Sequence, residues 1–292
     1  MTKKNLFSFI LIVIFILNLF AWSKVYFLLQ PETVKVLFFD VGQGDSIFIE
    51  TPEGHQMLID GGPGIAVLEK LGKVMPFWDR TIDLVILTHP EYDHLSGILE
   101  VLKNYKVENI LWTGVKRDTA EFQEWLGLIK EEGANIYIAQ AGQRISWGTF
   151  EKEKEYLDVL FPLDNLEGRE LKSANNSSVV IKLVFWENEF LFTSDIEAVI
   201  ERKLLREGVD VNSDVLKVAH HGSKTSSLAE FIEKVSPEVA VIQVGSENFY
   251  GHPATETLEV LENYGINIFR TDLQGDIKLT ANKERIYGVS DF

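Results

Sequence analysis

One long apolar stretch near the amino terminus dominates the hydrophobic pattern. No charged residue occurs from position 5 to position 23, and Leu, Ile, Val and Phe fill most of these positions. As a helix rising about 1.5 Å per residue, such a stretch spans the hydrocarbon core of a bilayer. The pattern therefore predicts a transmembrane helix, with residues 1–30 forming an anchor and linker.

The charges beside this stretch predict its orientation. Lys3 and Lys4 precede it, and positive residues favour the cytoplasmic side, so we expect a single span with the rest of the chain outside the cytoplasm. Lys24 follows the stretch and weakens this orientation without weakening the helix. A cleaved signal peptide is the alternative, although residues 20–23 contain no small-x-small cleavage site.

From residue 31 onward, short apolar runs alternate with helical patterns, and no repeat, low-complexity tract or long linker interrupts them. This predicts one soluble domain over residues 31–292. Turn signals at residues 42–44 and 52–54 separate three β-rich runs and predict an antiparallel start. The three runs are residues 34–40, 46–50 and 55–60.

The later part of the domain alternates between strands and helices. Strands are predicted at residues 82–88, 109–112, 156–161, 178–186, 189–193, 214–220 and 238–244. Helices are predicted at residues 95–105, 119–131, 196–206, 226–235 and 255–264. Because the strands form two sets, two sheets with helices outside them explain the order better than one doubly wound sheet.

Composition and charge narrow the possible functions. A hydrophobic content of 46% is ample for a core, which excludes a disordered chain. The formal net charge of −16 opposes binding of a polyanion by electrostatics alone, so any contact with nucleic acid must be local or metal-assisted. The sequence has no cysteine, which excludes disulfides, thiolate zinc sites and cysteine nucleophiles.

The strongest chemical signal is the segment THPEYDHLSG at residues 88–97, directly after an apolar run and before a predicted helix. Its four candidate metal ligands are His89, Glu91, Asp93 and His94. A strand that turns into a helix can bring these side chains to one point, and imidazole with carboxylate suits a divalent ion that binds water. The alternative is a solvated polar loop, but clusters of ligands mark sites better than single residues do.

Two later apolar runs also end in polar groups. Asp195 follows one of them and is either a metal ligand or the N-cap of the next helix. His220 and His221 end the other. Because side chains alternate along a strand, we expect only one of the pair to face a metal, while the other contacts substrate or orients a ligand.

Together these motifs resemble the metallo-β-lactamase superfamily, whose marker T-H-x-H-x-D-H follows a strand and is joined by a lone Asp and a late His. Within it, the chain from about residue 34 onward is most similar to the extracellular lactamase-like domain of ComEC-type competence proteins. The likeness rests on FDVGQGDS (39–46), LIDGG (58–62), SANNSS (173–178), FTSD (192–195) and HHGS (220–223). The resemblance implies an αββα sandwich with a dinuclear metal site on its edge, which hydrolyses a phosphoester or another ester-like bond.

The sequence departs from the superfamily pattern at two positions. Glu91 replaces the usual second His, and residues 175–177 offer Asn-Asn-Ser where a further His is expected. ComEC-like members resemble this chain at both positions. Carboxylate in place of imidazole moves the preference from zinc toward manganese, while the general order of affinity still favours zinc. Both metals therefore stay open.

The resemblance also implies roles for the candidate residues. The ligands of the two ions would be His89 and Glu91 in the first site, Asp93 and His94 in the second, Asp195 between them, and His220 or His221 completing the second. Asp93 and Asp195 are the expected catalytic carboxylates. In the implied mechanism a metal-bound hydroxide attacks phosphorus, and both metals stabilise the developing charge.

On the substrate side, the glycines of residues 40–46 either form a tight hairpin or let backbone amides approach a phosphate, with Gln43 and Asp45 lining the pocket. Asn176 is a further candidate for substrate binding. His252 would either bind a phosphate oxygen or simply start a helix ahead of a proline. Asp60 is expected to orient a ligand rather than to bind a metal itself.

These features predict a membrane-anchored, metal-dependent phosphodiesterase or DNase that is monomeric and acts on phosphodiesters such as single-stranded DNA. One alternative is an enzyme that hydrolyses a lactone, a β-lactam or a thioester. Another is a non-catalytic accessory domain for DNA uptake beside a separate channel, because a single helix cannot form a pore. An intact set of ligands argues against a non-catalytic domain.

Overall fold

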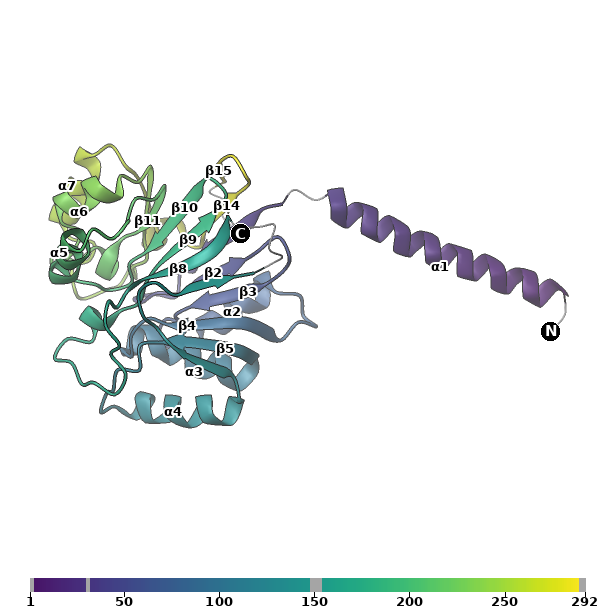
Figure 1. Cartoon of the computed structure of the whole chain (residues 1–292), viewed down its shortest axis with the longest axis horizontal. Coiled ribbons are helices and arrows are strands. Elements are labelled where there is room, and N and C mark those ends of the chain that lie inside the picture. Colours follow the sequence, from purple (N-terminus) through teal and green to yellow (C-terminus); the bar gives the residue numbers. More distant parts are fainter. Residues whose placement is uncertain (1–2, 30–31, 148–153, 289–292) are drawn as a thin grey trace. The chain divides into compact units, whose positions relative to one another are not determined.

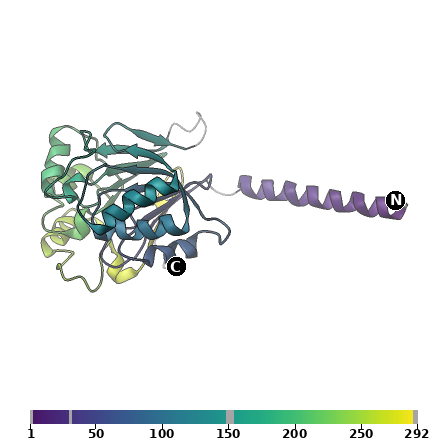
Figure 2. The same cartoon turned by 90° about the horizontal axis from the view of Figure 1, so that it is seen from below.

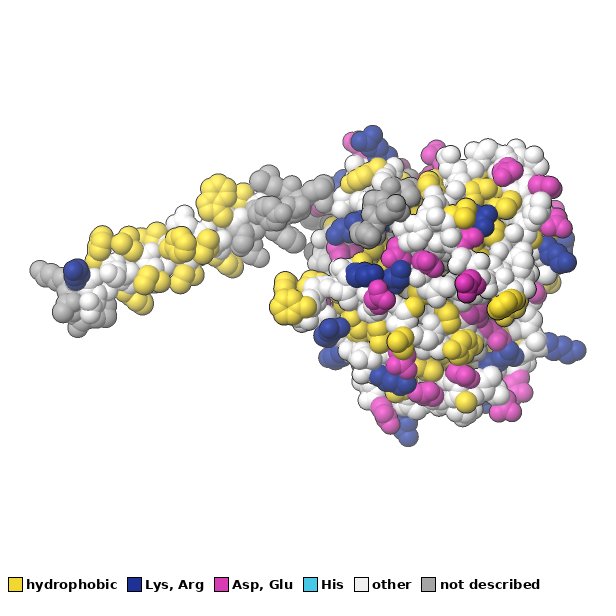
Figure 3. All heavy atoms as spheres, turned by 180° about the vertical axis from the view of Figure 1, so that it is seen from behind, with side chains coloured by type: hydrophobic (Ala, Val, Ile, Leu, Met, Phe, Trp, Pro, Cys, Tyr) yellow, Lys and Arg dark blue, Asp and Glu magenta, His cyan; other side chains and the backbone are white. Residues whose placement is uncertain are grey.

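The computed structural model describes residues 3–29, 32–147 and 154–288 (Figure 1). Contacts divide the chain into two compact units, Met1–Glu32 and Thr33–Phe292. The first unit contains the helix α1 (Lys3–Leu29). By length and composition, Lys4–Trp22 within α1 is a candidate membrane span, and none of that window is buried. Figure 3 shows hydrophobic side chains along the described surface of this helix.

The second unit contains two β-sheets. The first sheet has the order β15-β14-β1-β2-β3-β4-β5-β6, built from β1 (Val34–Phe38), β2 (Ile47–Glu50), β3 (Gln56–Ile59), β4 (Thr81–Leu87), β5 (Lys106–Trp112), β6 (Asn135–Ile138), β14 (Ile277–Ala281) and β15 (Ile286–Tyr287). The second sheet has the order β13-β12-β11-β10-β9-β8-β7, built from β7 (Arg144–Ser146), β8 (Glu155–Phe161), β9 (Val180–Phe185), β10 (Asn188–Phe192), β11 (Val215–Lys217), β12 (Val239–Ile242) and β13 (Asn267–Arg270).

Helices cover the outer face of each sheet (Figures 1 and 2). On the first sheet these are α2 (Ala66–Val74), α3 (Tyr92–Asn104) and α4 (Ala120–Glu132), and on the second they are α5 (Ala198–Arg206), α6 (Ala229–Val235) and α7 (Thr255–Asn263). A short helix, α8 (Thr271–Gln274), follows β13. The result is an αββα sandwich, which confirms the predicted fold class.

Alternation along the strands explains the layers. In β1, Val36 and Phe38 face the core between the sheets, whereas Leu37, and Phe39 just beyond the strand, face the core under the helices. Successive side chains of a strand point to opposite faces, so a strand that is apolar at every position is buried on both. This accounts for the continuous apolar runs in the sequence.

The strand directions confirm the predicted antiparallel start, because β1 pairs antiparallel with β2 and β2 with β3. From β3 to β6 the first sheet is parallel, and so is the second from β10 to β13. The carboxyl ends of parallel strands meet at one edge of a sheet, where ligand sites of α/β folds usually lie.

The structure corrects the predicted strand at residues 214–220. The strand β11 ends at Lys217, and Ala219–Gly222 form a 3₁₀ turn in which His220 and His221 have φ angles of 52° and 55°. The sequence analysis also missed α2, β6, β7, α8 and the last three strands, β13 to β15. The strand β6 is mostly exposed and lacks an apolar run that would predict it. The strand β14 pairs with β1, which is far away in the sequence, so local pattern does not reveal it.

Candidate metal centre

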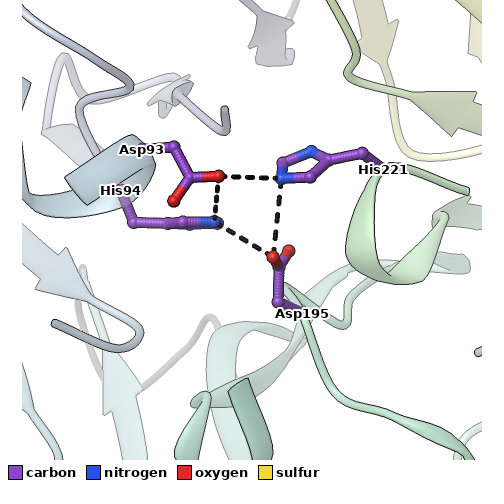
Figure 4. A group of neighbouring side chains, drawn as sticks. All are labelled: Asp93, His94, Asp195 and His221. Carbon is purple, nitrogen blue, oxygen red and sulfur yellow. Dashed lines mark ion pairs between the residues drawn. The ribbon is translucent and has the colours of Figure 1, made fainter. Parts of the chain in front are cut away.

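Four side chains from three separate segments converge at the carboxyl edge of the sheets (Figure 4). Asp93 and His94 lie in the first turn of α3, Asp195 follows β10, and His221 lies in the turn after β11. Their ligand atoms all lie within 4.8 Å of one another. His94, Asp195 and His221 are buried, while the side chain of Asp93 is 33% exposed.

The close approach of α3 to the end of β3 depends on two glycines, Gly61 and Gly97. Gly97 donates its backbone N–H to Gly62 O at 2.8 Å. A Cβ on Gly97 would collide with the backbone oxygen of Gly61, so only a residue without a side chain permits this packing. The contact places the first turn of α3, and with it Asp93 and His94, over the strand ends.

The distances suit a shared cation. Asp195 Oδ2 lies 3.4 Å from both His94 Nε2 and His221 Nε2. Asp93 Oδ2 lies 3.4 Å from His221 Nε2 and 4.0 Å from His94 Nε2. Among the described residues, neither Nε2 atom has a hydrogen-bond partner, although both are buried. Buried polar atoms are normally satisfied, so imidazole nitrogens aimed at carboxylates fit a divalent ion.

The second nitrogen of each imidazole is anchored. His94 Nδ1 donates to Asp60 Oδ2 at 2.8 Å, the orienting contact that the sequence predicts for Asp60. His221 Nδ1 donates to the backbone oxygen of Gln243 at 2.9 Å. Such bonds fix the ring orientation and leave Nε2 as the atom that faces the centre.

Opposite charges hold the cluster together. Burial alone would raise the pKa of Asp195, but His221 and His94 lower it well below its ordinary range. Burial alone would lower the pKa of His94 and of His221, but Asp195 raises both well above the ordinary value, helped by Asp60 at His94 and by Asp45 at His221. Protonated imidazoles thus neutralise the carboxylates.

We expect metal affinity to rise with pH. Because the pKa values of His94 and His221 are raised, both rings carry a proton at neutral pH that must leave before Nε2 binds an ion. Titration calorimetry with Zn²⁺ or Mn²⁺ between about pH 6 and pH 8, in buffers of different ionisation enthalpy, should show proton release. His94→Gln should reduce this release, because only the proton of His221 is then left to leave, and His55→Gln, at an exposed pair with Asp83, should not change it. Affinity that does not change with pH would contradict this prediction.

His89 lies beside the cluster, with its ring centroid 4.2 Å from that of His94. Burial, followed by the charge of His94, lowers the pKa of His89 to about 3. The ring is therefore neutral, and its buried Nε2 has no hydrogen-bond partner among the described residues. Both properties suit a ligand.

Glu91 and His220 are placed differently from the other expected ligands. Glu91 forms an ion pair with Arg117 and does not belong to the group of four, so it would have to leave a charge-assisted bond to bind a metal. Of the two adjacent histidines, His221 belongs to the group, whereas Nε2 of His220 lies 3.2 Å from Asn175 Nδ2 and 3.9 Å from Asp195 Oδ2. The two side chains point in different directions because the backbone makes a left-handed turn at both residues. The alternation of side chains along a strand, which the sequence predicted as the cause, is not the reason.

The expected substrate-binding residues lie in several environments. Gln43 Oε1 accepts a hydrogen bond from Gly245 N at 3.2 Å, and Asn176 Nδ2 donates to Glu197 Oε2 at 2.6 Å. Asp45 is buried. Burial lowers the pKa of His252 to about 4, helped by the charges of His221 and His220, so that ring is neutral. The segment with Gln43 joins antiparallel β1 and β2, as a hairpin requires.

Sequence reasoning missed Lys217. This fully buried lysine forms an ion pair with Asp45, lies 3.8 Å from Asp195 Oδ1, and donates to Ser194 O at 3.1 Å. Burial alone would raise the pKa of Asp45, but Lys217 and then His221 lower it. A lysine inside an apolar strand was the signal, because buried charges are almost always paired.

A two-sheet sandwich with imidazoles and carboxylates gathered at its strand ends defines a candidate metalloprotein. The family model described as Metallo-beta-lactamase superfamily matches residues 39–246. The chain therefore belongs to the metallo-β-lactamase superfamily, whose members are generally metal-dependent hydrolases. This confirms the resemblance found in the sequence.

Curated relatives include competence proteins. ComE operon protein 3 of Bacillus subtilis (strain 168) is 30% identical over 261 residues, covering 84% of this chain and 32% of the relative. Competence protein ComA of Neisseria gonorrhoeae is 30% identical over 271 residues, covering 88% and 36%. The chain thus spans about a third of the length of these relatives.

Among solved structures, a mutant of the CmlA beta-hydroxylase has a TM-score of 0.52 and 14% identity, covering 87% of this chain and 54% of that chain. A likeness at this level of identity concerns the fold alone. It agrees with the sandwich described above.

Proposed function

We propose that the chain is a membrane-anchored, metal-dependent phosphodiesterase, and more specifically a DNase that acts on single strands. The observation that carries the proposal is the convergence of His94 Nε2, His221 Nε2 and two carboxylates, with both nitrogens buried and without a hydrogen bond among the described residues. Two curated relatives are named for competence and for recombination, which are processes that handle DNA.

Bound zinc or manganese ions would supply Lewis-acid chemistry that activates water and stabilises negative charge on a phosphoryl group. In this proposal His89 and the group of four in Figure 4 hold them. Asp195 lies between both buried imidazoles and keeps them oriented. Asp93 is the one member of the group with an exposed part, so it can reach substrate and orient the attacking water.

The net charge of −16 does not oppose this proposal. A metal centre concentrates positive charge where the scissile phosphate binds, even in an acidic protein. The substrate then needs no extended basic surface.

An assay panel tests the proposed function. The full chain, loaded with Zn²⁺ or Mn²⁺, should hydrolyse bis-p-nitrophenyl phosphate and single-stranded DNA. Hydrolysis of lactones or β-lactams without any phosphodiester would replace this function with the other class of hydrolase. If the folded, metal-loaded protein hydrolyses none of these substrates, the alternative of a non-catalytic accessory domain beside a separate channel would replace the proposed function.

Localisation at the cell membrane, with residues 31–292 outside the cytoplasm, is part of the proposal. Lys3 and Lys4 lie at the amino-terminal end of the candidate span, so we expect protease added to intact cells to digest the domain while leaving this end protected. Immunoblots against tags at both ends measure this. Protection of the domain until the cells are lysed would contradict the orientation and remove the main support for a role in DNA uptake.

A further inference from the structure

Two large aromatic side chains stand exposed on the loop between β12 and α7. Phe249 is fully exposed, and Tyr250 is 74% exposed. The loop follows the carboxyl end of β12, which runs parallel to β11 and, through it, to β10. Since Asp195 and His221 follow β10 and β11, the two aromatic residues lie on the same edge of the sheet as the metal centre.

A row of rings connects Tyr250 to this centre. The ring of Tyr250 stacks on that of His252, with centroids 5.8 Å apart and planes at 16°. The ring of His252 lies 5.7 Å from that of His220, and Nε2 of His220 lies 3.9 Å from Asp195 Oδ2. The ring of Tyr250 is therefore linked to the metal centre through the rings of His252 and His220.

Hydrogen bonds brace the loop that presents these rings. Asn248 Nδ2 donates to the backbone oxygens of Gly245 and His252, each at 2.8 Å, and Asn248 Oδ1 accepts from His252 N at 3.0 Å. The aromatic side chains are thus held outward by a fixed backbone. Exposed apolar groups on a braced loop contribute little to folding and are typical of a binding surface.

We propose that Phe249 and Tyr250 form a nucleobase subsite, which stacks bases of a single strand next to the phosphate held at the metal centre. The inference rests on the proposed phosphodiesterase function and names its substrate class. Stacking requires no positive surface and tolerates every base, because each base has a π-face. In a protein of net charge −16, stacking supplies affinity that long-range electrostatics opposes.

This subsite also distinguishes single from double strands. Bases in a duplex are stacked on each other and are not free to stack on protein rings, whereas an unpaired strand can turn its bases outward. The subsite therefore favours single strands without reading their sequence.

The test is binding of two fluorescent oligonucleotides with hydrolysis-resistant phosphorothioate linkages to the metal-loaded full chain, one with normal bases and one with abasic sugars at the same number of linkages. Phe249→Ala/Tyr250→Ala should weaken binding of the base-bearing strand by roughly 5- to 100-fold and leave the abasic strand unchanged. Tyr250→Phe keeps a π-face and should retain affinity.

A matched control exists at the opposite edge. Phe77 and Trp78 are 81% and 74% exposed and lie ahead of the amino end of β4, so Phe77→Ala/Trp78→Ala should change neither affinity. Equal binding of both strands by the unmutated protein, or an unchanged affinity in the Phe249/Tyr250 variant, would overturn the subsite. Failure of the assay panel would overturn the proposed hydrolysis while this binding test still decides the subsite.

Discussion

Asp93→Ala should reduce hydrolysis of bis-p-nitrophenyl phosphate by more than about 100-fold, because loss of a group that orients a ligand already costs 10- to 100-fold and Asp93 would be a direct ligand. Its Oδ2 lies 3.4 Å from His221 Nε2, and it is the only member of the group of four that is not buried. The measurement is kcat/KM with saturating Zn²⁺ or Mn²⁺.

The control for this variant is Asp158→Ala. Asp158 lies on β8 and accepts hydrogen bonds from Arg144 through both of its carboxylate oxygens. Its substitution should have no effect on hydrolysis. Circular dichroism and metal content would show whether Asp93→Ala is folded and loaded. A folded Asp93→Ala protein with full activity would place the chemistry elsewhere in the molecule.

Lys217→Met should lower the free energy of unfolding by about 3–5 kcal/mol, the usual cost of breaking a buried ion pair from one side. The substitution leaves the buried carboxylate of Asp45 without the cation that most lowers its pKa. Asp195, whose Oδ1 lies 3.8 Å from Lys217 Nζ, loses a second, weaker contact. Urea denaturation of the metal-free protein measures the change.

Two comparisons test the cause of this loss. Asp45→Asn combined with Lys217→Met should recover part of the stability, because no unpaired charge remains. Lys103→Met removes the surface ion pairs with Glu100 and Glu124 and should change stability by less than about 1 kcal/mol. A Lys217→Met protein as stable as the unmutated one would show that the buried pair does not stabilise the fold.

The loss should also depend on pH. The pKa of Asp45 is lowered in the folded protein, so its contribution is present above its unfolded pKa, about 4, and disappears as the pH falls through the folded value. In acid, Asp45 is neutral with or without Lys217. The difference between the two proteins should therefore shrink below about pH 4.

Local pattern was enough to predict much of this molecule. Apolar runs predicted most central strands, because a strand buried on both faces must be apolar throughout. The segment that contains His89 and His94 was recognisable because its polar groups follow such a run directly. The candidate span was equally clear, since a bilayer requires one continuous apolar stretch.

The sequence by itself thus determined the αββα class and the superfamily, and it supplied the candidate metal ligands. Only the tertiary structure decided which of them meet. In the structure, Glu91 forms an ion pair with Arg117, and His221 rather than His220 belongs to the group of four. Lys217 forms an ion pair with Asp45. These outcomes depend on side chains far apart in the chain, and on a left-handed turn at His220 and His221. Periodicity cannot reveal them, because it reports only the burial of each segment and not the partner against which it packs.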